Sequence, residues 1–335
     1  MAGGFWNKML GRAAGQRPEP VAASTESAGL ARYELGVELG RGAMAVVHQA
    51  LDTQTQQQVA VKRLHLQRDF AAEDLVDVRA RFMREASAVR HLQHPDILQV
   101  LDAGESTQGA WIVMDLARGQ DLSHFTRPGR LLPVREVLQI AARLARALHY
   151  AHSQGVVHRD IKPANVMLDR SSLALKIMDF GIARIADGTR TRTGLVLGTP
   201  SFMSPEQLAG LKVDGRSDLY SLGVLLYQLL TGRLPHQSDS MAALMNQIAN
   251  QAPPDVRHFR PELPESLALV LALALEKRPE LRYANGEQFA QDLELILPQL
   301  PADVAPAQAL PGEEKTDPAF AQTLRLKPHD PGENS

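Results

Sequence analysis

The strongest constraint on this chain is one run of polar residues, His-Arg-Asp160-Ile-Lys162-Pro-Ala-Asn165, with Asp179-Phe-Gly shortly after it. Asp160 is placed to accept a proton from an attacking hydroxyl, and Lys162 can offset negative charge on a group in transfer. Asn165 and Asp179 offer the hard oxygen ligands that Mg²⁺ prefers. These residue types at these spacings predict a site that handles phosphates through bound Mg²⁺.

A glycine-rich loop precedes that run, with Gly40, Gly42 and Ala45 between two strand-like segments. Glycines allow backbone NH groups to approach phosphate oxygens. Lys62 ends the apolar run Val-Ala-Val downstream, at a distance that suits a phosphate-binding ammonium, and Glu85 is the candidate to orient it. The alternatives are a plain hairpin turn, a solvated edge lysine and an ordinary surface glutamate.

Hydrophobic periodicity changes along the chain and predicts a small sheet with one helix, followed by a helical domain. The expected strands lie at 46–50, 59–62, 97–101 and 111–114, with a helix at 75–92. The expected helices of the second domain lie at 134–154, 218–231, 240–251, 264–275 and 286–297. We expect residues 1–32 to form a flexible leader and residues 298–335 a disordered polar tail. Within the leader, we expect residues 1–12 to form a frayed arm or, alternatively, a short membrane-surface or docking helix.

Composition excludes several classes of site. The formal net charge is -2, which gives no basic excess for nucleic acid, and the chain has no cysteine for thiolate chemistry or Cys-ligated metals. No apolar stretch approaches the roughly 20 residues of a membrane span, so we expect a cytoplasmic protein. The pairs His91/His94 and His149/His152 have zinc-compatible spacing but lack a third ligand nearby.

Over residues 33–297 these motifs resemble the eukaryotic-like (bacterial) serine/threonine protein kinase family. The matching order is the glycine loop, Val-Ala-Val-Lys62, Glu85, His-Arg-Asp160, Asp179-Phe-Gly, Gly-Thr-Pro and Ser-Pro-Glu206. Ala45 departs from the third glycine of the loop pattern. The resemblance implies an α+β, two-lobed protein kinase fold. Its N-lobe, a small antiparallel sheet with one helix, would span 33–114, the hinge 115–119, and the larger, mainly helical C-lobe 120–297.

The resemblance also implies an activity and its cofactors, namely transfer of the γ-phosphoryl group of ATP to protein Ser or Thr hydroxyls with Mg²⁺, Mn²⁺ being an alternative ion. Asp160, Lys162, Lys62 and Glu85 would be catalytic, and Asn165 and Asp179 would bind metal. The implied nucleotide site comprises Leu39, Gly40, Gly42, Val47, Ala60, Lys62, Met114, Asp115, Ala117, Asp121 and Met167.

Other positions would support the fold by the same resemblance. Glu206 would pair with Arg282, Asp218 would hold the backbone of the catalytic loop, and His158 would pack against Phe180.

Three threonines are candidate phosphorylation sites. Arg159 has no obvious fixed anion, so phosphate on Thr193, or alternatively on Thr191, is expected to pair with it and order the loop before Ser-Pro-Glu. Thr323 in the tail resembles a ligand of FHA domains once phosphorylated.

We expect protein substrates within bacterial signalling and no nucleic-acid partner. Two alternatives remain open, a pseudokinase that only binds nucleotide and a small-molecule kinase of similar fold.

Overall fold

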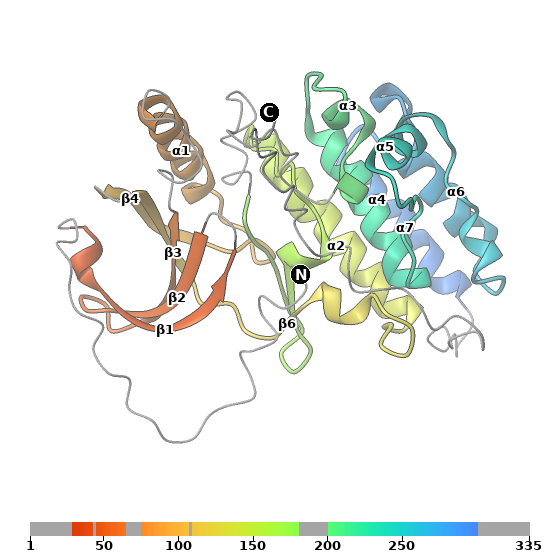
Figure 1. Cartoon of the computed structure of the whole chain (residues 1–335). Helices are drawn as coiled ribbons and strands as arrows, with labels where there is room; N and C mark the ends of the chain where they lie inside the picture. Colours follow the sequence, from red (N-terminus) through yellow and green to blue (C-terminus); the bar gives the residue numbers. More distant parts are fainter. Residues whose placement is uncertain (1–28, 43–44, 65–74, 107–108, 181–199, 301–335) are drawn as a thin grey trace, which may run out of the picture.

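The computed structural model describes residues 29–42, 45–64, 75–106, 109–180 and 200–300, which form a β-rich lobe beside a helical lobe (Figure 1). The strands are β1 (Tyr33–Arg41), β2 (Ala45–Asp52), β3 (Gln58–Leu64), β4 (Val100–Ser106), β5 (Gly109–Asp115), β6 (Gln120–Asp121), β7 (Val166–Asp169) and β8 (Ala174–Ile177). The helices are α1 (Leu75–Arg90), α2 (Val134–Ser153), α3 (Pro205–Leu208), α4 (Gly215–Thr231), α5 (Met241–Asn250), α6 (Glu265–Ala274) and α7 (Gly286–Ile296).

The N-lobe is a five-stranded antiparallel sheet in the order β1-β2-β3-β5-β4, with α1 packed against β4. Side chains of β3 alternate between its two faces, as the period of a strand requires. Val59 and Val61 join a small cluster with Tyr33 and Trp111, whereas Ala60 joins the main core. The main core continues into the helical lobe, so the two lobes share one apolar cluster.

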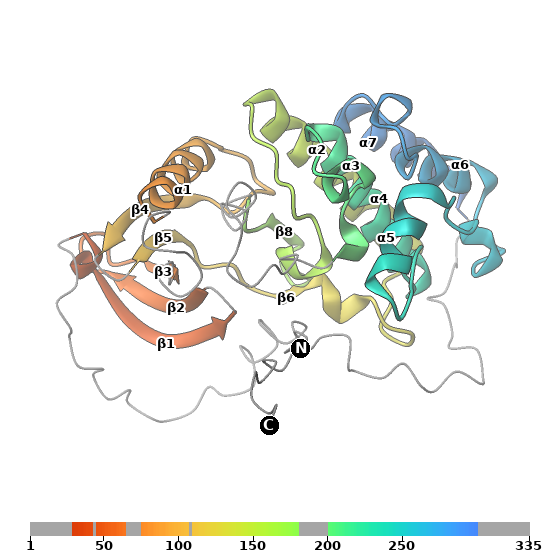
Figure 2. The same ribbon diagram turned by 45° about the horizontal axis from the view of Figure 1, so that its top comes forward.

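The C-lobe is organised around α4, which packs against α2 and α6 while α7 packs on α2. α4 is buried from Ser217 almost to its end, including the polar Ser217 and Asp218, so it packs against other parts of the lobe on all sides. A three-stranded sheet, β6-β7-β8, lies where the lobes meet (Figure 2). The C-lobe therefore presents β7, β8 and the turn before them to the N-lobe sheet.

The expected fold class is confirmed, with small differences at element ends. The five expected C-lobe helices and α1 match their expected ranges within three residues, whereas β1, β6, β7, β8 and the short α3 were not among the expected elements. The expected strand at 97–101 is wrong in its first half, since Ile97 makes only an isolated bridge to Ile177 and β4 begins at Val100.

The ordered chain also extends slightly beyond the expected domain limits. Leu30 and Leu300 are both buried, at 2% and 7% exposure, just outside the range 33–297. Within the described residues, none of the helices combines the length and the apolar character that crossing a bilayer demands.

Candidate active site

The loop that carries Asp160 is held by a buried carboxylate at the start of α4. Asp218 is fully buried, and its two oxygens accept the backbone NH groups of His158 at 2.8 Å and Arg159 at 2.7 Å. Nε2 of His152, near the end of α2, lies 2.7 Å from the same carboxylate. The expected role of Asp218 is confirmed. These charge-assisted contacts fix the backbone from which the functional side chains project.

Arg159 has a strained backbone in this loop. Its φ is +66°, a left-handed conformation that non-glycine residues adopt rarely and at a cost of about 1–3 kcal/mol. Two hydrogen bonds offset that cost. The NH of Arg159 donates to the Asp218 carboxylate, and its carbonyl accepts from Nε2 of Gln207 at 2.9 Å. The Nε of Arg159 is buried and has no hydrogen-bond partner among the described residues.

Asp160 has one carboxylate oxygen occupied by its neighbours. Oδ2 accepts from Nζ of Lys162 at 2.7 Å and from Nδ2 of Asn165 at 2.9 Å. Asn165 also donates to the Asp160 carbonyl at 2.7 Å. Within the described residues, the other oxygen, Oδ1, has no hydrogen-bond partner. The structure thus brings together the three side chains of Asp160, Lys162 and Asn165, whose roles stay predictions.

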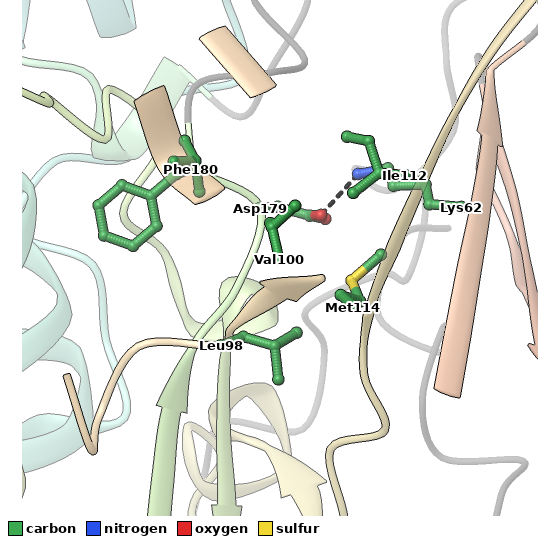
Figure 3. Close-up of a pocket in the computed structure, with 8 residues that line it drawn as sticks. Lys62, Leu98, Val100, Ile112, Met114, Asp179 and Phe180 are labelled. Carbon is green, nitrogen blue, oxygen red and sulfur yellow. Dashed lines mark hydrogen bonds and ion pairs between the residues drawn. The ribbon is translucent and has the colours of Figure 1, made fainter. Parts of the chain in front are cut away.

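Lys62 and Asp179 come from the two lobes and meet across a small pocket. Nζ of Lys62, on β3, lies 2.6 Å from Oδ1 of Asp179, which follows β8 (Figure 3). The pocket has a volume of about 20 Å³. It is lined by Lys62, Val89, Leu98, Val100, Ile112, Met114, Asp179 and Phe180. The Lys62 ammonium thus contacts Asp179, one of the two expected metal ligands.

Lys62 is not paired with Glu85, its expected partner, in this structure. Among the described residues, no ion pair joins these two side chains, and the lysine is paired with Asp179 instead. The side chain that α1 brings to the pocket beside Lys62 is Val89. An ammonium binds the carboxylate that lies closest, and in this arrangement that carboxylate is Asp179.

Asp179 also has a left-handed backbone, with φ of +58°. The preceding residue, Met178, donates its NH to the carbonyl of Asn165 at 2.8 Å, so the two expected metal ligands are tied together through the backbone. Burial alone would raise the pKa of Asp179, but the charge of Lys62 and its hydrogen bond outweigh this and lower that pKa. The carboxylate therefore remains ionised, as a cation ligand must.

The chemistry of these donors fits a divalent cation. Because Asn165 uses its NH₂ group to bind Asp160, its amide oxygen is left for a metal, and Asp179 retains its second carboxylate oxygen beside the bond to Lys62. Both are hard oxygen ligands, and Mg²⁺ sites of this kind complete their coordination with waters and substrate phosphates.

The residues expected at the nucleotide come from both lobes, and two of them, Lys62 and Met114, line the small pocket. Gly40 pairs with Val47 across β1 and β2, and the NH of Gly42 donates to the carbonyl of Ala45 at 2.8 Å. The apolar members are all buried within the shared core, namely Leu39, Val47, Ala60, Met114, Ala117 and Met167. Their placement from both lobes is compatible with two walls around a flat ring.

The segment between the lobes requires glycine at one position. Gly119 has φ of +105°, and a Cβ there would lie 2.3 Å from the Leu168 carbonyl oxygen. The NH of Asp115 donates a hydrogen bond to the carbonyl of Gln99 at 3.0 Å. Asp121 is only 3% exposed and its carboxylate caps the following 3-10 turn through the NH of Ser123, so its expected contact with a ribose stays a prediction.

The supporting contacts expected from the resemblance are present. The rings of His158 and Phe180 lie 4.6 Å apart. Arg282 binds Glu206 through both terminal nitrogens at 2.7 Å, and the two side chains are 0% and 6% exposed. Such a bidentate buried pair ties α3 to the end of the helical lobe.

Two contributors to the site were not predicted. His152 was weighed only as a zinc ligand, and Gln207 was not singled out. The pattern Ser-Pro-Glu-Gln207 carries a capping-box signal, which the structure confirms at Ser204, but that signal gives no hint of the bond to Arg159.

The histidine pairs do not form a metal site in the described part of the chain. No group of three or more acidic or histidine side chains there could hold a metal ion. Nδ1 of His94 accepts the NH of Asp96 at 3.0 Å, and Nδ1 of His91 lies 2.7 Å from the Ser87 carbonyl. Several expectations fall outside the described residues, namely those on Thr191, Thr193 and Thr323 and on residues 1–12.

Comparisons with known proteins give a family match and several similar proteins. The sequence profile of the protein kinase domain matches residues 33–292. A probable serine/threonine-protein kinase of Streptomyces coelicolor is 42% identical over 283 residues, which cover 82% of this chain and 41% of that protein. The serine/threonine-protein kinase PknB of Mycobacterium leprae is 41% identical over 270 residues, covering 78% and 42%. The chain thus spans about two fifths of the length of these relatives.

Solved structures show the same similarity. The kinase domain of PknI from Mycobacterium tuberculosis superposes with a TM-score of 0.63 at 33% identity, covering 79% of this chain and 96% of that one. Rad53 in complex with AMP-PNP superposes with a TM-score of 0.65 over 78% of this chain and 64% of that one, at 24% identity, which bears on the fold alone.

Proposed function

Because this chain belongs to the protein kinase domain family, of the eukaryotic-like type found in bacteria, we propose that it transfers the γ-phosphoryl group of ATP to serine and threonine hydroxyls of proteins. The observation that carries the proposal is the cluster on Asp160, where Lys162 and Asn165 hold one carboxylate oxygen and leave the other open. A site of this kind works mainly by positioning groups and by stabilising charge.

Asp160 has the central part in this mechanism. Its Oδ1 would accept the proton of the attacking hydroxyl, while the contacts on Oδ2 keep the carboxylate in one orientation. Lys162 lies close enough to Asp160 to place its ammonium beside the transferred group and offset the charge that develops there. Both side chains are about one quarter exposed, at 21% for Lys162 and 28% for Asp160, so a substrate can reach them.

Asn165 and Asp179 would hold the divalent cation, for which Mg²⁺ is the proposed ion and Mn²⁺ the alternative. When bound, the cation would supply positive charge that offsets the negative charge of the ATP phosphates. As the nucleotide enters, Lys62 would turn from Asp179 to the phosphates. We propose that Glu85 then replaces Asp179 as the carboxylate that orients Lys62.

Arg159 supports a regulatory part of the proposal. Its buried Nε lacks a hydrogen-bond partner among the described residues, and a guanidinium in that state is suited to a phosphate. We therefore propose that phosphorylation of Thr193, with Thr191 as the alternative, orders the loop before α3. Thr193→Ala should lower transfer to an exogenous protein at least tenfold, with Thr189→Ala as the control. Full activity of Thr191→Ala/Thr193→Ala would refute this switch.

Partners beyond the protein substrate remain proposals. Phosphorylated Thr323 would bind an FHA domain, and mass spectrometry after incubation with ATP and Mg²⁺ would test it by detecting or failing to detect phosphate on Thr323. The cytoplasm stays the proposed compartment.

The proposed reaction is tested with radiolabelled ATP and three acceptors in parallel: a mixed protein substrate, choline and an aminoglycoside. We expect label on protein, and acid hydrolysis should release phosphoserine or phosphothreonine rather than phosphotyrosine. Label on a small molecule alone would favour the small-molecule kinase. Nucleotide binding without any transfer would favour the pseudokinase.

A further inference from the structure

The peptide group that joins Arg159 to Asp160 is held at both of its polar atoms. Its carbonyl accepts a hydrogen bond from Nε2 of Gln207 at 2.9 Å, and its NH donates to Nδ1 of His158 at 3.1 Å. Nε2 of the same His158 ring lies 2.8 Å from the Met178 carbonyl, so Nε2 carries the proton and Nδ1 is the nitrogen that accepts. The orientation of this peptide group sets where the side chain of Asp160 begins.

The strain at Arg159 explains why this peptide group has to be held. The φ of +66° is a conformation that a non-glycine residue keeps only where its surroundings enforce it. Because the peptide group is planar, a relaxation of Arg159 that turns its carbonyl also moves the Cα of Asp160. Asp218 restrains the NH of Arg159, on the far side of its Cα. The half that is shared with Asp160 is restrained by His158 from within the loop and by Gln207 from outside it.

Gln207 is itself fixed by the first turn of α3. Its Oε1 accepts the NH of Ser204 at 2.9 Å, and its own NH donates to Oγ of Ser204 at 3.3 Å, which completes a capping box. With Oε1 engaged in this way, the NH₂ group faces the Arg159 carbonyl, which can only accept. Ser204 is fully buried and Gln207 is half-buried. One side chain thus joins the start of α3 to a backbone group 48 residues earlier in the chain.

We propose that Gln207 is a positioning residue for phosphoryl transfer, which holds Asp160 in place through the Arg159 carbonyl and couples that place to the first turn of α3. Its amide acts on the backbone of the loop, so its effect on the reaction is indirect. A displacement of the start of α3 would reach Asp160 through this bridge. The inference rests on the proposed kinase function and adds a residue to it.

Two single variants separate this role from a general loss of stability. Gln207→Met removes the donor at a similar side-chain length. It should lower kcat for transfer to a protein substrate about fivefold, the value of one net hydrogen bond, at an unchanged KM for ATP. Ser204→Ala weakens the same capping box but leaves the bond from Gln207 to Arg159 in place. It should lower the unfolding temperature while keeping kcat within twofold of the wild type.

A double variant tests the route through Asp160. Once Asp160→Asn has removed the proton acceptor, its position no longer matters, so adding Gln207→Met should not lower the residual rate further. The inference is overturned if Gln207→Met keeps the wild-type kcat, if Ser204→Ala loses as much kcat as Gln207→Met does, or if the losses from Asp160→Asn and Gln207→Met multiply. A wild type that transfers no phosphate to protein would instead overturn the proposed function, and this inference with it.

Discussion

Asp160 and its partners show what a sequence can reveal at the scale of single residues. Lys162 and Asn165 lie within five residues of Asp160, so local backbone geometry brings the three side chains together, although their spacing indicated only separate roles. Lys62 and Asp179 are 117 residues apart, and their pairing depends on how the lobes meet. The sequence offered Glu85 as the partner instead, because spacing does not say which carboxylate lies nearest to an ammonium.

Lys62→Met tests the role of the ammonium on β3. Loss of a charge-assisted contact to the phosphates removes about 1.5–3 kcal/mol, so kcat/KM should fall roughly 10- to 100-fold. Steady-state transfer to a protein substrate measures this. Lys212→Met, at an exposed lysine far along the chain, is the matched control and should retain wild-type kinetics. Equal activity of the two variants would remove Lys62 from the site.

At the scale of elements, helices were more predictable than the contacts between them. The 3.6-residue period located all of α2, α4, α5, α6 and α7, because each has an apolar face that must be buried. The first half of the strand expected at 97–101 was wrong because a short apolar run does not distinguish a paired strand from a single bridge. Contacts such as Gln207 to the Arg159 carbonyl join elements 48 residues apart, and no local pattern encodes them.

The buried pair of Glu206 and Arg282 links α3 to the end of the lobe and allows a stability prediction. Glu206→Gln leaves a buried guanidinium without its counter-charge and should cost about 3 kcal/mol of unfolding free energy at neutral pH. Glu280→Gln, in the exposed Arg278–Glu280 pair, is the control and should change it by less than about 0.5 kcal/mol. Urea denaturation measures both.

The same variant has a pH dependence whose sign follows from the pKa of Glu206. Burial alone would raise that pKa, but the hydrogen bonds from Arg282 and Ser217 outweigh it and hold the pKa below its ordinary value of 4.5. The carboxylate therefore contributes its full stability above pH 4.5 and loses it as the pH falls through the lower folded value. The difference between wild type and Glu206→Gln should narrow in acid. A difference that is constant from pH 7 to pH 3 would contradict this.

At the scale of the whole molecule, the change from strand to helical periodicity predicted two lobes. The order of the N-lobe strands and the apolar core shared by the lobes were not accessible in this way, since they depend on contacts far apart in sequence.

Because the proposed nucleotide site draws on both lobes, ligand binding should stabilise the molecule as a unit. A non-hydrolysable ATP analogue with Mg²⁺, at about 100 times its Kd, should raise the unfolding free energy by about 2.7 kcal/mol. Thermal unfolding measures this, with the analogue plus EDTA as the comparison, where the shift should be smaller. An unfolding temperature that ignores the analogue would argue against the cleft between the lobes.

The most direct test of the central claim is the rate of phosphoryl transfer by Asp160→Asn. Asparagine keeps the shape of the side chain but cannot accept the proton, so transfer to a protein substrate should fall by roughly 10² or more. The stabilisation by the ATP analogue should persist, which separates lost chemistry from lost folding. Asp239→Asn, at an exposed carboxylate, is the matched control and should transfer phosphate at the wild-type rate. An Asp160→Asn protein as active as the wild type would contradict the assignment of Asp160 and the mechanism built on it.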